Sequence, residues 1–170
     1  MAEFEPKIKP LSKDSVGKAL EKAERYRLLN EAREAESICL DVLELEPNNQ
    51  QALVLLVLAL TDQFRSGRAG TVQAARDVLQ RLDGEYEQHY YQGIICERRA
   101  KALLSQSGPG SAVAAYEWFR EAMGWFEKAE ALRPPGNDDA ILRWNTCVRT
   151  LQRNPHLQPA DEERVEPYLE

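Results

Sequence analysis

The sequence has little of what catalytic and metal sites usually need. It contains only two histidines and three cysteines, and the cysteines (Cys39, Cys96 and Cys147) are widely separated and form no CxxC pair. An odd number of dispersed cysteines does not indicate a disulfide framework, and the missing pairs argue against a zinc site. We expect all three thiols to be small core residues in a reducing compartment.

The two histidines do not complete a catalytic arrangement. His89 and Cys96 share a helical face but are separated by about 10 Å along a helix, too far for a nucleophile and its base. Glu85 and His89 could share a metal, but no third ligand is near them in the sequence. The SGPGSA segment at Ser107 follows no strand and lacks the Gly-Lys-Ser/Thr of a phosphate loop. We predict a protein that is not an enzyme, with no catalytic residue, cofactor or metal.

The chain also lacks an excess of positive charge and a long apolar run. Its formal net charge is −6, whereas binding to nucleic acid needs a basic surface. The most apolar stretch, Ala52 to Leu60, is far shorter than the roughly 20 residues that cross a bilayer. Residues 1–11 have no apolar central segment of the kind found in signal peptides. These features predict a cytoplasmic protein that binds neither nucleic acid nor membrane.

What the sequence does have is helical periodicity, interrupted at regular intervals by proline and glycine. No alternating apolar and polar run indicates a sheet. The pattern predicts helices over residues 12–29, 31–45, 49–64, 71–82, 85–104, 111–132 and 138–153. We accordingly divide the chain into an N-terminal extension (1–11), a helical domain (12–154) and an acidic, proline-containing tail (155–170), which we expect to be extended and solvated.

Two segments of the chain repeat one pattern. Residues 34–47 read EAESICLDVLELEP, and residues 121–134 read EAMGWFEKAEALRP. The shared positions are an alanine twelve residues before a proline and a thiol or aromatic residue four after that alanine (Ala35 and Ala122; Cys39 and Phe126). This pattern resembles the second helix of a tetratricopeptide repeat, which is Ala-x3-Phe followed by a proline that ends the helix.

A degenerate third copy has Ala75, Leu79 and Leu82 at the same spacing, with Gly84 in place of the proline. The resemblance covers roughly residues 15–153 and is to small, bacterial-type tetratricopeptide proteins. It implies an all-α fold, a right-handed superhelix of antiparallel helix pairs with about three repeats and a C-terminal capping helix.

In the tetratricopeptide family the first helix of each pair lines a concave surface that binds a peptide. The resemblance therefore places a groove on the first, third, fifth and seventh predicted helices. The candidate groove residues are Leu20, Glu24, Arg27, Val54, Leu58, Tyr90, Ile94, Arg98, Lys101, Asn145 and Arg149. Arg98 and Arg149 could hold a carboxylate bidentately; the alternative is that both are ordinary solvated helix residues.

A well-known subset of the family clamps a chaperone's C-terminal carboxylate with lysines and asparagines. The matching places here hold Leu20, Glu24 and Leu58, so this function does not carry over. We predict a non-catalytic scaffold that binds an unidentified protein or peptide in the concave groove. The alternative is a self-associating module, a homodimer whose contact is the acidic tail or a terminal helix.

Overall fold

The computed structural model of this 170-residue chain describes residues 3–160. It confirms the predicted all-helical class, since that range contains seven α-helices, two short 3-10 turns and no strand. The helices are α1 (Val16–Leu28), α2 (Ala32–Leu45), α3 (Gln50–Thr61), α4 (Thr71–Leu79), α5 (Glu85–Leu104), α6 (Ser111–Leu132) and α7 (Asp139–Arg153), and the 3-10 turns are η1 (Lys13–Ser15) and η2 (Phe64–Ser66).

Local chemistry explains where the helices begin and end. Asn49 caps α3, because its side-chain oxygen accepts a hydrogen bond from the Ala52 N–H at 2.9 Å. Asn30 ends α1 in the left-handed region, with φ of 61°, a conformation that asparagine tolerates better than most residues. The predicted helix over 71–82 stops at Leu79, and the next residues turn more tightly, since the N–H groups of Arg81 and Leu82 bond to carbonyls three residues back.

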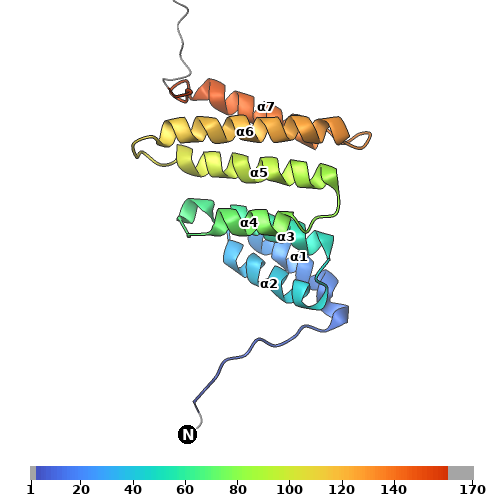
Figure 1. Cartoon of the computed structure of the whole chain (residues 1–170). Helices are drawn as coiled ribbons and strands as arrows, with labels where there is room; N and C mark the ends of the chain where they lie inside the picture. Colours follow the sequence, from blue (N-terminus) through green and yellow to red (C-terminus); the bar gives the residue numbers. More distant parts are fainter. Residues whose placement is uncertain (1–2, 161–170) are drawn as a thin grey trace, which may run out of the picture.

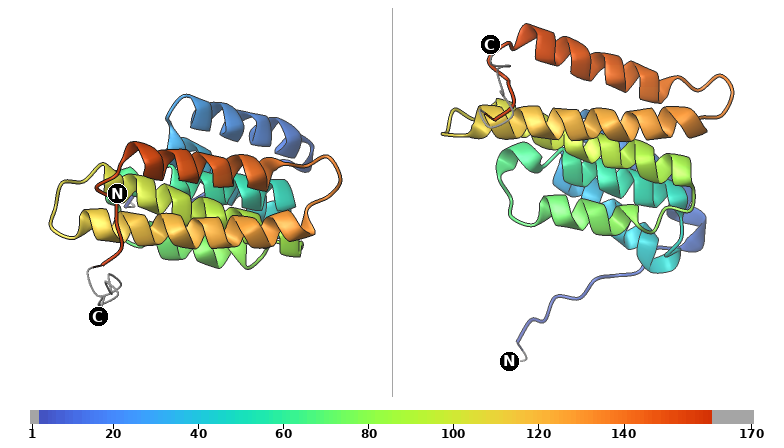
Figure 2. Two further views of the ribbon diagram at one scale, coloured as in Figure 1. Left: turned by 90° about the horizontal axis from the view of Figure 1, so that it is seen from above. Right: turned by 45° about the horizontal axis from the view of Figure 1, so that its top comes forward.

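The helices stack in the order of the sequence (Figure 1). Each helix packs against the next one along the chain, and α3 also contacts both α1 and α5. The pair α1–α2 lies at one end of the stack, and α7 lies along α6 at the other end (Figure 2). Odd-numbered helices therefore come next to one another although a full helix separates them in sequence.

The core consists of two apolar clusters. The first is built mainly from α1 to α4, and the second mainly from α5 to α7. Helix α5 contributes to both, with Ile95 and Ala102 in the first cluster and Cys96 and Ala100 in the second.

Helices α5 and α6 approach closely at Gly93. A Cβ atom added there would lie 2.5 Å from Cε1 of Phe126, whose ring is fully buried. Only glycine fits this position, because a Cβ would overlap the ring. The Phe126 of the second repeat segment therefore fills the space that Gly93 leaves.

The three cysteines are all buried, as expected from the sequence. Burial raises the pKa of each thiol to about 12. The tryptophans, by contrast, are only half-buried. The guanidinium of Arg76 lies 5.3 Å from the ring of Trp118, and Nζ of Lys128 lies 4.3 Å from that of Trp125.

Most of the predicted acidic tail, residues 161–170, lies outside the described residues. Within the preceding part of the tail, Leu157 is 5% exposed and packs into the second cluster. The first residues after α7 are therefore attached to the body through Leu157. Among residues 3–160, no helix combines the length and apolar character that a bilayer crossing needs.

Candidate functional site

An open cleft of about 480 Å³ lies where the odd-numbered helices come together. We call it the cationic cleft. Its lining comes from the end of α1 and the following loop, the start of α2, the end of α3, η2, α5 and α7: Arg27, Leu28, Asn30, Ala32, Thr61, Asp62, Arg65, Arg98, Lys101 and Arg143.

Asp62, the residue that follows α3, joins three elements at the base of the cleft. It accepts a hydrogen bond from Nε of Arg27 at 2.8 Å and another from Nη1 of Arg98 at 2.7 Å. A carboxylate at a helix C-terminus is opposed by the helix dipole, and the two guanidinium groups offset that cost. The two ion pairs hold both arginine side chains at the floor of the cleft. The Arg27–Asp62 pair is well shielded from water, because both of its side chains are less than a fifth exposed.

Glu97 on α5 forms a second charged group beneath the cleft. Its side chain is fully buried, and its two oxygens lie 3.3 Å from Nζ of Lys101 and 3.3 Å from Nη2 of Arg143. These contacts do not have hydrogen-bond geometry, so neither oxygen has a hydrogen-bond partner. A buried carboxylate is stable only with nearby positive charge. Glu97 therefore anchors α7 to α5 through Arg143.

The charge of the cleft is opposite to that of the whole chain. Five cationic side chains line it, whereas the carboxylates that neutralise them are those of Asp62 and Glu97. The chain as a whole carries −6. A concave site with an excess of one sign of charge concentrates ligands of the other sign, so the cleft, with five cations against Asp62 and Glu97, favours anionic groups.

The structure brings together three of the residues predicted for the groove. Arg27, Arg98 and Lys101 all line the cationic cleft. Leu20 and Ile94 are instead core residues, 3% and 2% exposed, and cannot contact a ligand. Their apolar side chains lie on the helix faces that pack against neighbouring helices, and not on the faces that line the cleft.

The remaining predicted residues lie away from the cleft lining. Val54 and Leu58 are half-buried, packed against the first and second clusters respectively. The ring of Tyr90 is 5.9 Å from that of Phe126, between α5 and α6, and burial raises its pKa to about 12. Glu24 and Arg149 are exposed and Asn145 is half-buried, and none of the three lines the cleft.

Sequence reasoning missed Asp62, Arg65, Glu97 and Arg143 as cleft residues. Helical spacing places Glu97 on the same stripe of the fifth helix as Arg98 and Lys101, but it does not show that Glu97 is buried, because glutamate is seldom fully buried without a partner. The available signal was its spacing of four residues from Lys101, which indicates an ion pair on one helical face. Nothing in the sequence connects Arg143 to that pair, because the contact depends on how α7 folds back.

Comparison of the chain with protein-family models, curated proteins and solved structures gives no match. The tetratricopeptide resemblance therefore remains a prediction that rests on the repeated segments and their spacing.

Proposed function

We propose that this chain is a non-catalytic interaction module that binds an extended, carboxylate-rich segment of another protein in the cationic cleft. The observation that supports the proposal is the gathering of five cationic side chains in one open cleft of an acidic protein. We further propose that the helix pairs α1–α2, α3–α4 and α5–α6 form tetratricopeptide-like repeats in a right-handed superhelix, with α7 as the capping helix.

The repeat proposal is supported by the positions that the three segments share. Ala35, Ala75 and Ala122 are each fully buried on the second helix of a pair. The contacts of α3 with α1 and with α5 are those expected when successive pairs stack on their neighbours. In such a stack the first helices of the pairs share one face, and α1, α3 and α5 all contribute to the cationic cleft.

The preference for carboxylates follows from unused donors. Arg98 donates to Asp62 through Nη1 only, although a guanidinium carries five N–H groups. Arg65 is exposed and makes no ion pair within the described residues. A ligand carboxylate can therefore bind to these arginines without breaking the pairs that hold the helices together.

The spacing of the cations suits an extended ligand. Arg98 and Lys101 are three residues apart on α5, which places their Cβ atoms about 5–6 Å apart. In an extended peptide, alternate side chains point the same way at intervals of about 6.6 Å. Two acidic residues separated by one residue would thus meet both cations, and the long side chains can absorb the small difference.

Peptide binding measured by fluorescence anisotropy tests the proposal. The probe is a labelled peptide of alternating glutamate and glycine, compared with a peptide of the same length in which glutamine replaces glutamate. We expect the acidic peptide to bind with a salt-dependent Kd, and Arg65→Gln or Arg98→Gln to weaken it about tenfold or more, since hydrogen bonds to charged groups contribute about 1.5–3 kcal/mol.

Arg99→Gln is the matched control, because Arg99 is on the same helix but lines a different surface hollow. It should leave the Kd unchanged. Far-ultraviolet circular dichroism should be the same for all variants, so that a loss of binding is separate from a loss of fold. Equal binding of both peptides, or equal weakening by Arg99→Gln, would contradict the proposal.

A further inference from the structure

Residues 161–170 of the sequence, DEERVEPYLE, are strongly acidic. They contain five carboxylate side chains and one arginine. We call these residues, which lie outside the described part of the chain, the acidic segment. Their net charge is opposite to that of the cationic cleft, where five cations outnumber two carboxylates. The acidic segment therefore has the composition of a ligand for the cleft.

The chain that leads to the acidic segment is anchored close to the cleft. Leu157 is buried in the second cluster and lines a hollow together with Leu103 and Leu104, the last two residues of α5. Lys101, which lines the cleft, comes three residues before Leu104, or about 4.5 Å along the helix axis. The anchor thus holds the start of the acidic segment at the end of α5 that carries the cleft.

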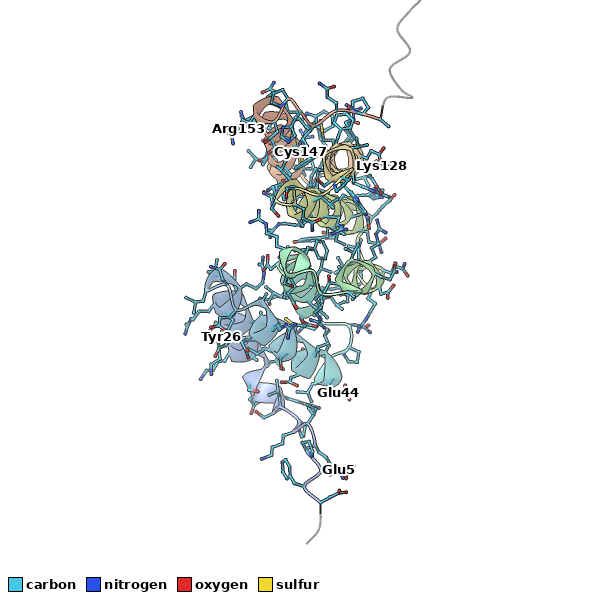
Figure 3. All side chains as sticks on the ribbon, turned by 90° about the vertical axis from the view of Figure 1, so that its left-hand side faces the viewer. Glu5, Tyr26, Glu44, Lys128, Cys147 and Arg153 are labelled. Carbon is cyan, nitrogen blue, oxygen red and sulfur yellow. The ribbon has the colours of Figure 1, made fainter. Side chains whose placement is uncertain are left out.

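The acidic segment is long enough to lie across the cleft. Arg153, the last residue of α7, and Tyr26, near the end of α1, lie on the same side of the stack (Figure 3). Packed helices are about 8–10 Å apart, so the path from α5 across α3 to α1 is about 16–20 Å. Ten extended residues span roughly 33–36 Å. Around Leu157 the chain first passes the start of α6, at Ser111 and Ala112 (Figure 2), and the surplus length allows the segment to turn back.

We propose that the acidic segment occupies the cationic cleft of its own chain and competes there with the acidic segment of a partner. This inference rests on the proposed function of the cleft, and it adds that a partner must displace the chain's own residues. Arg65 makes no ion pair within the described residues, and Arg98 donates to Asp62 through Nη1 only. Carboxylates of the segment bind the remaining N–H groups of these arginines.

Apolar side chains at the rim of the cleft support this occupant. Leu28 lines the cleft and is 79% exposed, and the neighbouring Leu29 is 63% exposed. The acidic segment carries Val165, Tyr168 and Leu169 among its carboxylates. One segment can therefore place carboxylates on the arginines and cover the leucines with apolar surface, which removes that surface from water.

Attachment to the same chain makes even weak binding effective. A segment on a short linker has an effective concentration in the millimolar range. With a Kd of about 0.1 mM for the free segment, the cleft is occupied about ten times as often as it is open. A partner then binds about tenfold more weakly than it binds to an open cleft, because only the open fraction is competent.

Neutralising the acidic segment within the intact chain measures the competition. The variant replaces all five carboxylates with amides: Asp161→Asn, Glu162→Gln, Glu163→Gln, Glu166→Gln and Glu170→Gln. We expect it to bind the labelled peptide of alternating glutamate and glycine about tenfold more tightly than the wild type does. A measurable Kd that is the same for both proteins overturns the proposal.

A control variant has the same change in net charge elsewhere on the surface. It replaces five exposed glutamates that do not line the cleft: Glu3→Gln, Glu5→Gln, Glu117→Gln, Glu121→Gln and Glu127→Gln. This variant should bind the peptide like the wild type. A gain in affinity equal to that of the neutralised segment would mean that only the overall charge matters, and it would overturn the proposal.

Cross-linking locates the acidic segment without using the peptide probe. Tyr168 is replaced with photoreactive benzoylphenylalanine, and the linked residues are identified by mass spectrometry. We expect links within one molecule to the cleft lining, and their loss when Arg65→Glu is added. The same photoreactive group at Phe4, which is 90% exposed before α1, should not link to the cleft. Links between two molecules, or links outside the cleft lining, overturn the proposal.

The two measurements separate this inference from the proposed function. Cross-links in the cleft, combined with a peptide that binds neither the wild type nor the neutralised variant, support the inference and contradict partner binding. Equal peptide binding by both proteins, without cross-links in the cleft, supports partner binding and overturns the inference.

Discussion

Replacing Gly93 with alanine tests the close approach of α5 and α6. Alanine is favoured over glycine inside a helix by about 0.8–1.0 kcal/mol, so the substitution would stabilise the protein if space allowed. The new Cβ, however, would lie within 3.0 Å of three atoms of the buried Phe126 ring. Overpacking a core by one methyl group typically costs about 1–3 kcal/mol.

Gly124, in the interior of α6, provides the matched comparison. A Cβ there meets no atom within 4 Å, so Gly124→Ala should stabilise the chain by roughly 1 kcal/mol. The propensity gain is the same at both sites and cancels in the difference. Gly93→Ala should therefore be about 1–3 kcal/mol less stable than Gly124→Ala.

Thermal unfolding followed by circular dichroism measures this difference. A gap of about 2 kcal/mol corresponds to a difference in Tm of about 4–8 °C for a chain of this length. Adding Phe126→Leu to Gly93→Ala should recover part of the loss, since the two side chains then no longer overlap. If Gly93→Ala raises the Tm as much as Gly124→Ala does, the two helices do not approach as described.

Three further predictions concern other parts of the molecule. Arg143→Met should lower the free energy of unfolding by about 1–3 kcal/mol in urea titrations, because it leaves the buried Glu97 with Lys101 alone; Arg149→Met, on the exposed side of α7, should change it little. Burial raises the pKa of the three thiols from 9.0 to about 12, so the unfolded chain loses these protons first as the pH rises. The free energy of unfolding should thus fall between pH 9 and 12 by up to ~1.4 kcal/mol per pH unit for each thiol, and Cys96→Ala should reduce that slope in denaturant titrations at a series of pH values. Asn30→Val should cost about 1–2 kcal/mol in thermal unfolding, because the φ of 61° is unfavourable for a branched side chain, whereas Asn30→Gly should be close to neutral.

The helices were predictable because the helical periodicity of apolar residues ended where glycine or proline residues occur in the sequence. The bounds of α5 and α6 match the prediction to the residue, since Gly84 and Gly110 precede their starts and Arg133-Pro134 follows α6. The third helix ends earlier than predicted. There the chain turns into η2, which is followed by Gly67 in the left-handed region.

The site was only partly predictable from the sequence. Counting by helical spacing placed Arg27, Arg98 and Lys101 on ligand-facing surfaces, and these residues do meet in one cleft. Helical spacing alone could not show that Leu20 is buried in the core, because it does not tell which face of the helix packs against the next helix. Asp62 was missed because its role arises from the end of α3 meeting two other helices.

Helix α5 connects the two halves of this protein, α1–α4 and α6–α7. It is the helix through which α1–α4 and α6–α7 are joined, because its side chains enter both apolar clusters. Arg98 and Lys101 lie on this same helix and pair with Asp62, which follows α3, and with Glu97 of α5 itself. A ligand bound to either cation, as proposed above, would contact the helix that joins the two halves, and its binding free energy would include any change in the angle between them. If the proposed binding in the cleft occurs, its strength therefore depends on the stiffness of the stack as well as on the charge of the cleft.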